Sequence, residues 1–213
     1  MNNFKKWLNT QTLITVFIVV SIFVYGIEST NAASGQKSNP AKTTVKVGKK
    51  RIITPNRARN FLNDLDMPTR DYEKTGTVGL YGGYQADSDN FILETRDPDR
   101  FLNNLSYSVF GDKNVAKAVE LNLNVNDVSF SSNAVGELIK YSDFLMQKIT
   151  GKHLTPQIKK AMQTKTSGEW LVDGYKIKLK KYTFPPEKLI KGEAPTSDRG
   201  AFSLTFLIEL FDK

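Results

Sequence analysis

Cysteine does not occur among the 213 residues of this chain. Its absence excludes disulfides, thiol nucleophiles and thiolate ligands for a metal. It also excludes a lipoprotein anchor, because that lipid is attached to a cysteine at the cleavage site. Large hydrophobic and aromatic residues are plentiful, so the chain is expected to fold on its hydrophobic core alone and not to be disordered.

Histidine occurs only once, as His153, in a predicted loop just after Gly151. A catalytic histidine needs an acid or a nucleophile beside it, and a metal site with one histidine needs several carboxylates around it. The sequence alone brings no such group to His153. We therefore expect a surface histidine, with no metal site and no cofactor.

Long apolar runs are also scarce, and the single one covers residues 13–27, LITVFIVVSIFVYGI. Lys5 and Lys6 precede this run, and a small, polar segment with a mediocre cleavage site after Ala32 follows it. A positive start, an apolar middle and a small-residue end are the three regions of a secretory signal peptide. The sequence therefore predicts that residues 1–32 direct the chain out of the cytoplasm.

A single-pass membrane anchor remains the alternative interpretation of this run. Its fifteen residues fall short of the ~20 that a spanning helix needs. Counting Trp7 and Leu8 as an interfacial start brings a helix over residues 8–27 into range. Under either interpretation the rest of the chain is extracytoplasmic, periplasmic or secreted, and under the second it stays tethered to the cytoplasmic membrane.

Acidic residues are missing between Ser34 and Arg59, where eight lysines and arginines occur. From Asn60 to Lys213, by contrast, twenty bases face twenty-one acids. Glycine, serine and proline interrupt residues 33–53, which predicts a basic, flexible linker that we call the neck. The basic character of the protein is therefore concentrated before the folded domain.

The neck is suited to an anionic surface, such as lipid head groups or an anionic cell-wall polymer, with about 1 kcal/mol per base at best. The alternative is a spacer whose lysines only keep it solvated. Nucleic acid is not an expected partner, because no aromatic side chains interleave with the bases. The candidate anionic-surface contacts are Lys42, Lys46, Lys49, Lys50 and Arg51.

Residues 54–213 predict a single α+β domain: a mostly antiparallel sheet of about five or six strands with helices packed on one face, preceded by the N-terminal hydrophobic helix. Thr-Pro pairs predict helix starts at Pro55 and Pro156, and Asp173-Gly174 predicts a hairpin turn. Glycines inside the first strand indicate a bulge or a close backbone approach. Helices are expected at residues 55–66, 98–110, 132–150 and 156–164, and strands at residues 77–86, 91–95, 119–130, 169–172, 175–184 and 201–211.

Acidic side chains give weak signals for chemistry. Residues 87–90, DSDN, begin like a calcium loop, but Ile92 stands in place of the glycine and Pro98 in place of the late glutamate that such a loop needs. A hairpin turn is therefore expected there. A glycoside hydrolase needs two facing carboxylates, and Glu137, Glu169 and Asp173 are free to supply them, as are almost any two acids.

Three lysines, Lys176, Lys178 and Lys180, alternate along one face of a predicted strand. One interpretation is a charged edge strand that guards against pairing with another sheet. The other is a stripe that binds an anion together with the neck.

These observations predict a non-enzymatic, exported or membrane-anchored envelope module of bacterial type that binds a protein partner or an anionic surface. Single-pass proteins with a small α+β domain beyond the membrane are common in bacterial envelope machines, which is an analogy of layout. The alternative is a secreted hydrolase that cleaves cell-wall carbohydrate with carboxylates. Two acids facing each other in a cleft would favour the hydrolase, and an exposed apolar or basic patch would favour the binding module.

Overall fold

The computed structural model describes residues 52–93, 102–184 and 200–210. The predicted signal or anchor segment, and the neck up to residue 51, lie outside the described residues. Among the helices of the described ranges, none has the length and apolar character needed to span a membrane.

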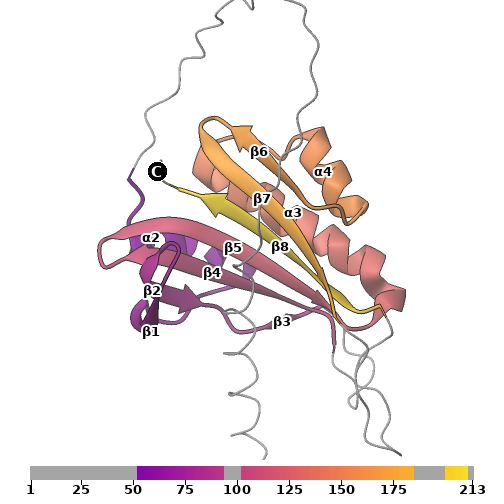
Figure 1. The fold of residues 1–213 in the computed structure, drawn as a ribbon, viewed down its shortest axis with the longest axis horizontal. Coiled ribbons are helices and arrows are strands. Elements are labelled where there is room, and N and C mark those ends of the chain that lie inside the picture. Colours follow the sequence, from indigo (N-terminus) through magenta and orange to yellow (C-terminus); the bar gives the residue numbers. More distant parts are fainter. Residues whose placement is uncertain (1–51, 94–101, 185–199, 211–213) are drawn as a thin grey trace, which may run out of the picture. The chain divides into compact units, whose positions relative to one another are not determined.

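The described residues contain one antiparallel sheet of eight strands, in the order β1-β2-β4-β5-β8-β7-β6, with β3 also paired to β4 (Figure 1). The predicted α+β class with an antiparallel sheet is therefore confirmed, with more strands than the five or six expected. The strands are β1 (Glu73–Gly79), β2 (Gly82–Asp87), β3 (Phe91–Ile92), β4 (Asn104–Asp112), β5 (Val115–Val125), β6 (Gly168–Val172), β7 (Tyr175–Thr183) and β8 (Phe202–Glu209).

The helices begin where the Thr-Pro pairs predict. The hydroxyl oxygens of Thr54 and Thr155 accept hydrogen bonds from backbone N–H groups in the first turns of α2 and α4, which caps both helices. Gly151, with φ of 76°, ends α3 in the left-handed conformation that favours glycine. The described helices are α2 (Pro55–Arg59), α3 (Ser131–Thr150) and α4 (Pro156–Gln163), with 3-10 helices at Asn60–Leu65 and Val128–Phe130.

The predicted helix over residues 98–110 is wrong in its described part, where β4 occupies Asn104–Asp112. Leu105, Tyr107 and Val109 are fully buried, while the residues between them are partly exposed. Leu105 and Val109 fit helical spacing as well as strand alternation. Pairing with β5 makes this segment a strand, because it buries the face that carries Leu105, Tyr107 and Val109. Residues 98–101 lie outside the described residues.

Two predicted strands have different bounds in the structure. The strand expected over residues 77–86 is two strands, β1 and β2, joined by a turn at Leu80 and Tyr81. The strand expected over residues 119–130 is β5, which starts earlier, at Val115, and ends at Val125. The remaining strands agree within two residues as far as the chain is described.

The core lies between the sheet and α2 and α3 (Figure 1). Leu121 of β5 pairs with Phe206 of β8, both side chains are fully buried, and they belong to one cluster with Leu138 and Leu145 of α3. Each such side chain contributes about 1.5–3 kcal/mol on burial. The hydroxyl of Tyr107 donates a hydrogen bond to the Ala58 carbonyl (2.8 Å), which ties α2 to the same side of the sheet. We call this side the helix face and the opposite side the open face.

Gly82 is the close backbone approach that the glycines of the first strand predicted. Its φ is 120°, in the region that favours glycine, and a Cβ atom added there would lie 2.2 Å from the Gly111 carbonyl oxygen. The glycine therefore lets β2 lie tightly against β4 and directs the turn that carries Tyr81.

Gly82→Ala is expected to destabilise the domain by about 2 kcal/mol or more, because both the positive φ and the contact with a backbone carbonyl oppose a side chain. Unfolding in urea, followed by circular dichroism, measures the effect. Gly76→Ala in β1 is the matched control, because nothing lies within 4 Å of its Cβ position. Equal midpoints for Gly82→Ala and the control would contradict the prediction.

Candidate functional site

Polar and charged side chains gather on the open face of the central strands. The strand registers align them in rows: Ser108 of β4, Glu120 of β5, Leu207 of β8 and Lys178 of β7 are neighbours in one row. The next row places Glu209 of β8 between Ala118 of β5 and Lys176 of β7. The strand alternation that buries the helix face therefore also brings these groups together.

Glu209 is the centre of this arrangement. Lys178 Nζ lies 2.6 Å from Glu209 Oε1, and the two side chains are only 12% and 6% exposed. The Tyr81 hydroxyl reaches over from the β1–β2 turn and donates a hydrogen bond to the same oxygen (3.0 Å). Burial raises the pKa of Glu209, but the hydrogen bonds from Lys178 and Tyr81 outweigh it and leave the pKa below its usual value.

Tyr81 closes one end of the open face. Its ring packs against that of Phe110 with centroids 6.3 Å apart. Burial and the hydrogen bond to Glu209 raise the pKa of Tyr81 well above its usual range, so its hydroxyl stays protonated. Residues 81 and 209 are 128 positions apart in the chain, and only the sheet topology makes them partners.

Glu120 lies nearby on β5 as a half-buried carboxyl group. Burial raises its pKa to about 7; Lys180 opposes this shift and Asp87 adds to it. Asp87 itself accepts hydrogen bonds from Ser108 Oγ (2.6 Å) and Gln85 Nε2 (2.8 Å). The open face thus holds the Glu120 carboxyl group, which changes charge near neutral pH, beside the Asp87 carboxylate, which accepts hydrogen bonds from Ser108 and Gln85. Sequence reasoning missed Glu120, because it stands in no motif, and considered Asp87 only as the start of the segment that resembles a calcium loop.

The three alternating lysines of β7, Lys176, Lys178 and Lys180, do not match either sequence interpretation. β7 lies between β8 and β6, so it is not an edge strand of the described sheet. Lys176 pairs with Glu169 (2.8 Å), Lys178 with Glu209, and Lys180 faces Glu120. Each lysine therefore has an acidic neighbour, which leaves no bare cationic stripe along this strand.

The acids considered for a hydrolase are dispersed. Glu169 on β6 pairs with Lys176, Asp173 in the β6–β7 turn pairs with Lys152 (2.7 Å), and Glu137 on α3 pairs with Lys140 (2.9 Å). They lie on three different elements, each with its own lysine. The structure does not bring them together as a catalytic pair.

The segment that begins like a calcium loop forms the connection from β2 to β3. Ser88 Oγ donates to the Asp89 carbonyl and accepts from the Tyr107 N–H, and Asp89 pairs with Arg70. These contacts are those of a turn. No cluster of three or more metal-ligating side chains is present among the described residues.

His153 lies in the exposed connection between α3 and α4 and contacts Asp143 (Nδ1 to Oδ2, 2.7 Å). Asp143 also accepts the Leu154 N–H (2.7 Å) and pairs with Lys159 (3.3 Å). Burial raises the pKa of Asp143, but these hydrogen bonds outweigh it and lower the pKa overall. The pair ties the connection between the helices to α3, and no hydroxyl or thiol nucleophile contacts His153 in the described part of the chain.

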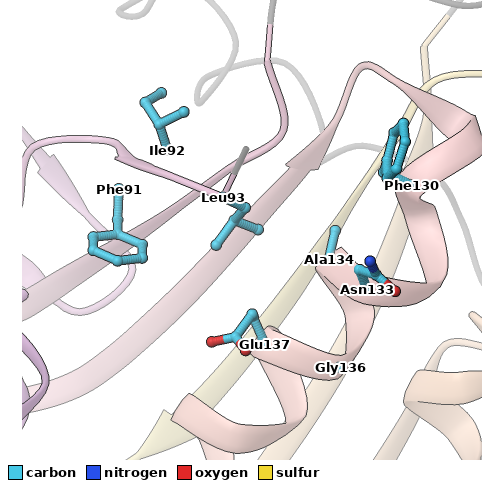
Figure 2. A pocket seen from close by; sticks show the side chains of 8 residues that line it. All are labelled: Phe91, Ile92, Leu93, Phe130, Asn133, Ala134, Gly136 and Glu137. Carbon is cyan, nitrogen blue, oxygen red and sulfur yellow. The ribbon is translucent and has the colours of Figure 1, made fainter. Parts of the chain in front are cut away.

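Two open grooves, each of about 620 Å³, lie away from the open-face carboxylates. Figure 2 shows the first, between β3 and the N-terminal half of α3. Phe91 and Leu93 line one wall, Phe130 and Ala134 the other, and Glu137 is the acidic residue among the described residues that line it. The groove thus mixes apolar and polar side chains, and its described lining carries no pair of carboxylates.

The second groove lies where α2 begins, beside the β4–β5 turn. Its aromatic part is a pair of half-buried tyrosines, Tyr72 and Tyr84, whose rings stack with centroids 5.7 Å apart. Burial, then Asp112 and Tyr84, raise the pKa of Tyr72 to about 12, so its hydroxyl stays protonated and donates to the Asp112 carbonyl (3.1 Å). The polar lining consists of Thr54, Asn56, Arg59, Asp71, Lys113 and Asn114.

The anionic-surface contacts predicted from the sequence, Lys42, Lys46, Lys49, Lys50 and Arg51, lie outside the described residues. No protein-family model, no curated protein and no solved structure matches this chain.

Proposed function

We propose that this protein is an exported or membrane-anchored module of a bacterial-type envelope that acts by binding, and that its neck holds it against an anionic surface. The observation that carries this proposal is the segregation of charge. Between Ser34 and Arg59 there are eight bases and no acid, whereas from Asn60 to Lys213 the twenty bases and twenty-one acids nearly balance.

The contacts of the folded domain support this division. Lys176 and Lys178 on β7 pair with acids, and Arg59, the last base of the basic stretch, pairs with Asp71 (3.1 Å). Charges that are already compensated at short range add little to binding a distant surface. The bases of the neck have no acids near them in sequence, so an external anion is their natural partner.

Binding of the full-length protein to two anionic surfaces tests the proposal. The probes are purified cell-wall sacculi and vesicles of phosphatidylglycerol in phosphatidylcholine, each sedimented with the protein at several salt concentrations. In the test variant, glutamine replaces Lys42, Lys46, Lys49, Lys50 and Arg51. Its affinity for whichever of the two surfaces the wild type binds is expected to fall roughly 100-fold or more at low salt, and its affinity should depend less on the salt concentration.

A matched control removes the same charge from the folded domain. Lys74, Lys140, Lys148, Lys152 and Lys160 are all exposed, and their glutamine variant should bind nearly as the wild type does. Binding to sacculi alone would identify a wall polymer, and binding to vesicles alone a lipid surface. If neither probe binds and the protein instead copurifies with one envelope protein, the anionic-surface proposal is wrong and a protein partner replaces it.

The hydrolase is the second candidate, and Glu120 is the observation that favours it. A carboxyl group with a pKa of about 7 is suited to act as a general acid near neutral pH, and Asp87 is a second acid on the same face. It ranks second because neither described groove contains these two residues. Release of soluble sugar from sacculi by the wild type, and its loss in Glu120→Gln, would favour the hydrolase.

A further inference from the structure

The tyrosine groove beside α2 has the composition of a carbohydrate site. Its volume of about 620 Å³ lies within the roughly 300–1,000 Å³ typical of small-ligand pockets. Tyr72 and Asp71 come from the segment before β1 and Tyr84 comes from β2, and the other polar residues come from α2 with its N-cap residue and from the β4–β5 turn. Four parts of the chain therefore combine an aromatic surface with hydrogen-bonding groups.

The aromatic surface is held in a fixed orientation. Tyr72 stacks on Tyr84 at an interplanar angle of 23°, and its hydroxyl is fixed by the Asp112 carbonyl. Gly111 leaves room for that hydroxyl, because a Cβ atom there would lie 2.7 Å from it. A preorganised ring loses little entropy when a ligand binds to it.

The polar side of the groove is also preorganised. Arg59 Nε donates to Thr69 Oγ1 (3.2 Å), and Nη2 donates to Asp71 Oδ1 (3.1 Å). Its Nη1 group makes no hydrogen bond to the described residues. Among the described lining residues, Arg59 and Lys113 are positive and Asp71 is negative, which sums to one positive charge.

This combination favours a sugar over an apolar ligand. The C–H groups of a pyranose ring pack on the electron-rich face of an aromatic ring, while its hydroxyl and amide groups need donors and acceptors around the edge. Two tyrosines with an arginine and the side-chain amides of Asn56 and Asn114 supply both. A lipid chain would instead leave these polar groups without partners.

The groove is also joined directly to the basic neck. Thr54 and Pro55 line it, and Thr54 follows Arg51 by only three residues, which is at most about 10 Å of extended chain. A cell-wall glycan with sugar rings and regularly spaced negative charges has chemistry that matches both the groove and the neck.

We propose that Tyr72 and Tyr84 form a binding site for a sugar ring of an anionic cell-wall glycan. The choice of an anionic polymer rests on the proposed function, whereas the sugar site rests on the groove itself. A site of this kind would give the neck, which senses only charge, a preference for glycans over other anionic surfaces.

Tyr84 is the residue to change, because the hydroxyl of Tyr72 has a structural partner. In the full-length protein, Tyr84→Leu is expected to weaken binding of chitotetraose, a neutral sugar probe, and of sacculi about tenfold. Tyr84→Phe keeps the ring and is expected to bind within about threefold of the wild type. Tyr182→Leu is the matched control: Tyr182 is 43% exposed on β7, does not line the groove, and should leave binding unchanged.

A measurement on the wild type guards against a variant that fails to fold. With ring-labelled tyrosine, adding chitotetraose should shift the NMR signals of Tyr72 and Tyr84 and leave that of Tyr182 in place. Unshifted Tyr72 and Tyr84 signals, or equal affinities for Tyr84→Leu and Tyr182→Leu, would overturn the sugar site. Binding of a proline-rich peptide to the groove in place of the sugar would overturn it too.

The sugar site and the neck fail in distinguishable ways. If Tyr84→Leu binds sacculi like the wild type while the glutamine neck variant does not, the inference is wrong and the proposed function stands. If Tyr84→Leu loses chitotetraose while the neck variant keeps sacculus binding, the sugar site stands and the role of the neck is wrong.

Discussion

Glu209→Gln is expected to destabilise the domain by about 3–5 kcal/mol at pH 7, the cost of leaving one member of a buried ion pair without its partner. Lys178 Nζ lies 2.6 Å from Glu209 Oε1, and the lysine side chain is only 12% exposed. Glutamine retains an acceptor for the Tyr81 hydroxyl, so the substitution tests the loss of the negative charge alone. The free energy of unfolding in urea measures the effect.

Two comparisons test the cause. Glu169→Gln removes the partner of Lys176 on the same face, but that pair is 44% and 55% exposed, so no measurable loss is expected. Lys178→Met combined with Glu209→Leu should recover most of the lost stability, because burying two apolar groups costs less than burying one unpaired charge. A Glu209→Gln protein as stable as Glu169→Gln would show that the pair is solvated.

The dependence of this pair on pH follows from the lowered pKa of Glu209. Its contribution is fully present above the ordinary pKa of a glutamate, about 4.3. The contribution is lost as the pH falls through the lower pKa of the folded state. The stability difference between wild type and Glu209→Gln should therefore shrink in acid.

The sequence correctly predicted the elements that are specified by a few adjacent residues. Thr155 before Pro156 gave the start of α4, Asp173-Gly174 the β6–β7 turn, and the alternation around Leu121 the central strand β5. In each case the physical cause is contained in a few adjacent residues: a cap, a positive φ or a buried face.

The incorrect helix shows where local signals stop being sufficient. The spacing of Leu105 and Val109 fits both a helix and a strand. The segment is a strand, with Tyr107 buried on the same face, because β5 pairs alongside it. The contact between Tyr81 and Glu209 on the open face also depends on strand pairing, between segments that are farther apart in the sequence. Tyr81 reaches Glu209 because β8 returns beside β5 in the middle of the sheet, and no spacing in the sequence encodes that return.

Glu120→Gln is expected to stabilise the domain at neutral and higher pH, in contrast to the change at Glu209. Burial raises the pKa of Glu120 from 4.5 to about 7, so the folded state disfavours its charged form. Each pKa unit corresponds to about 1.4 kcal/mol, and partial contact with solvent reduces the total. A gain on the order of 2 kcal/mol is expected above pH 7, measured as the free energy of unfolding in urea.

The sign of the pH dependence makes this prediction specific. Between about pH 4.5 and 7 the folded wild type holds a proton on Glu120 that the unfolded chain has released, so the stability from this residue is present at low pH and lost as the pH rises through 7. The stability of the Glu120→Gln variant should not show this decrease between about pH 4.5 and 7.

The neighbours of Glu120 supply an internal check. Asp87→Asn should move the fall to lower pH, because Asp87 helps to raise the pKa, and Lys180→Gln should move it to higher pH, because Lys180 lowers it. Parallel stability curves for wild type and Glu120→Gln from pH 4 to 8 would mean that the carboxyl titrates as in water. Glu120 would then be unsuited to the general-acid role, and the hydrolase alternative would lose the observation that favours it.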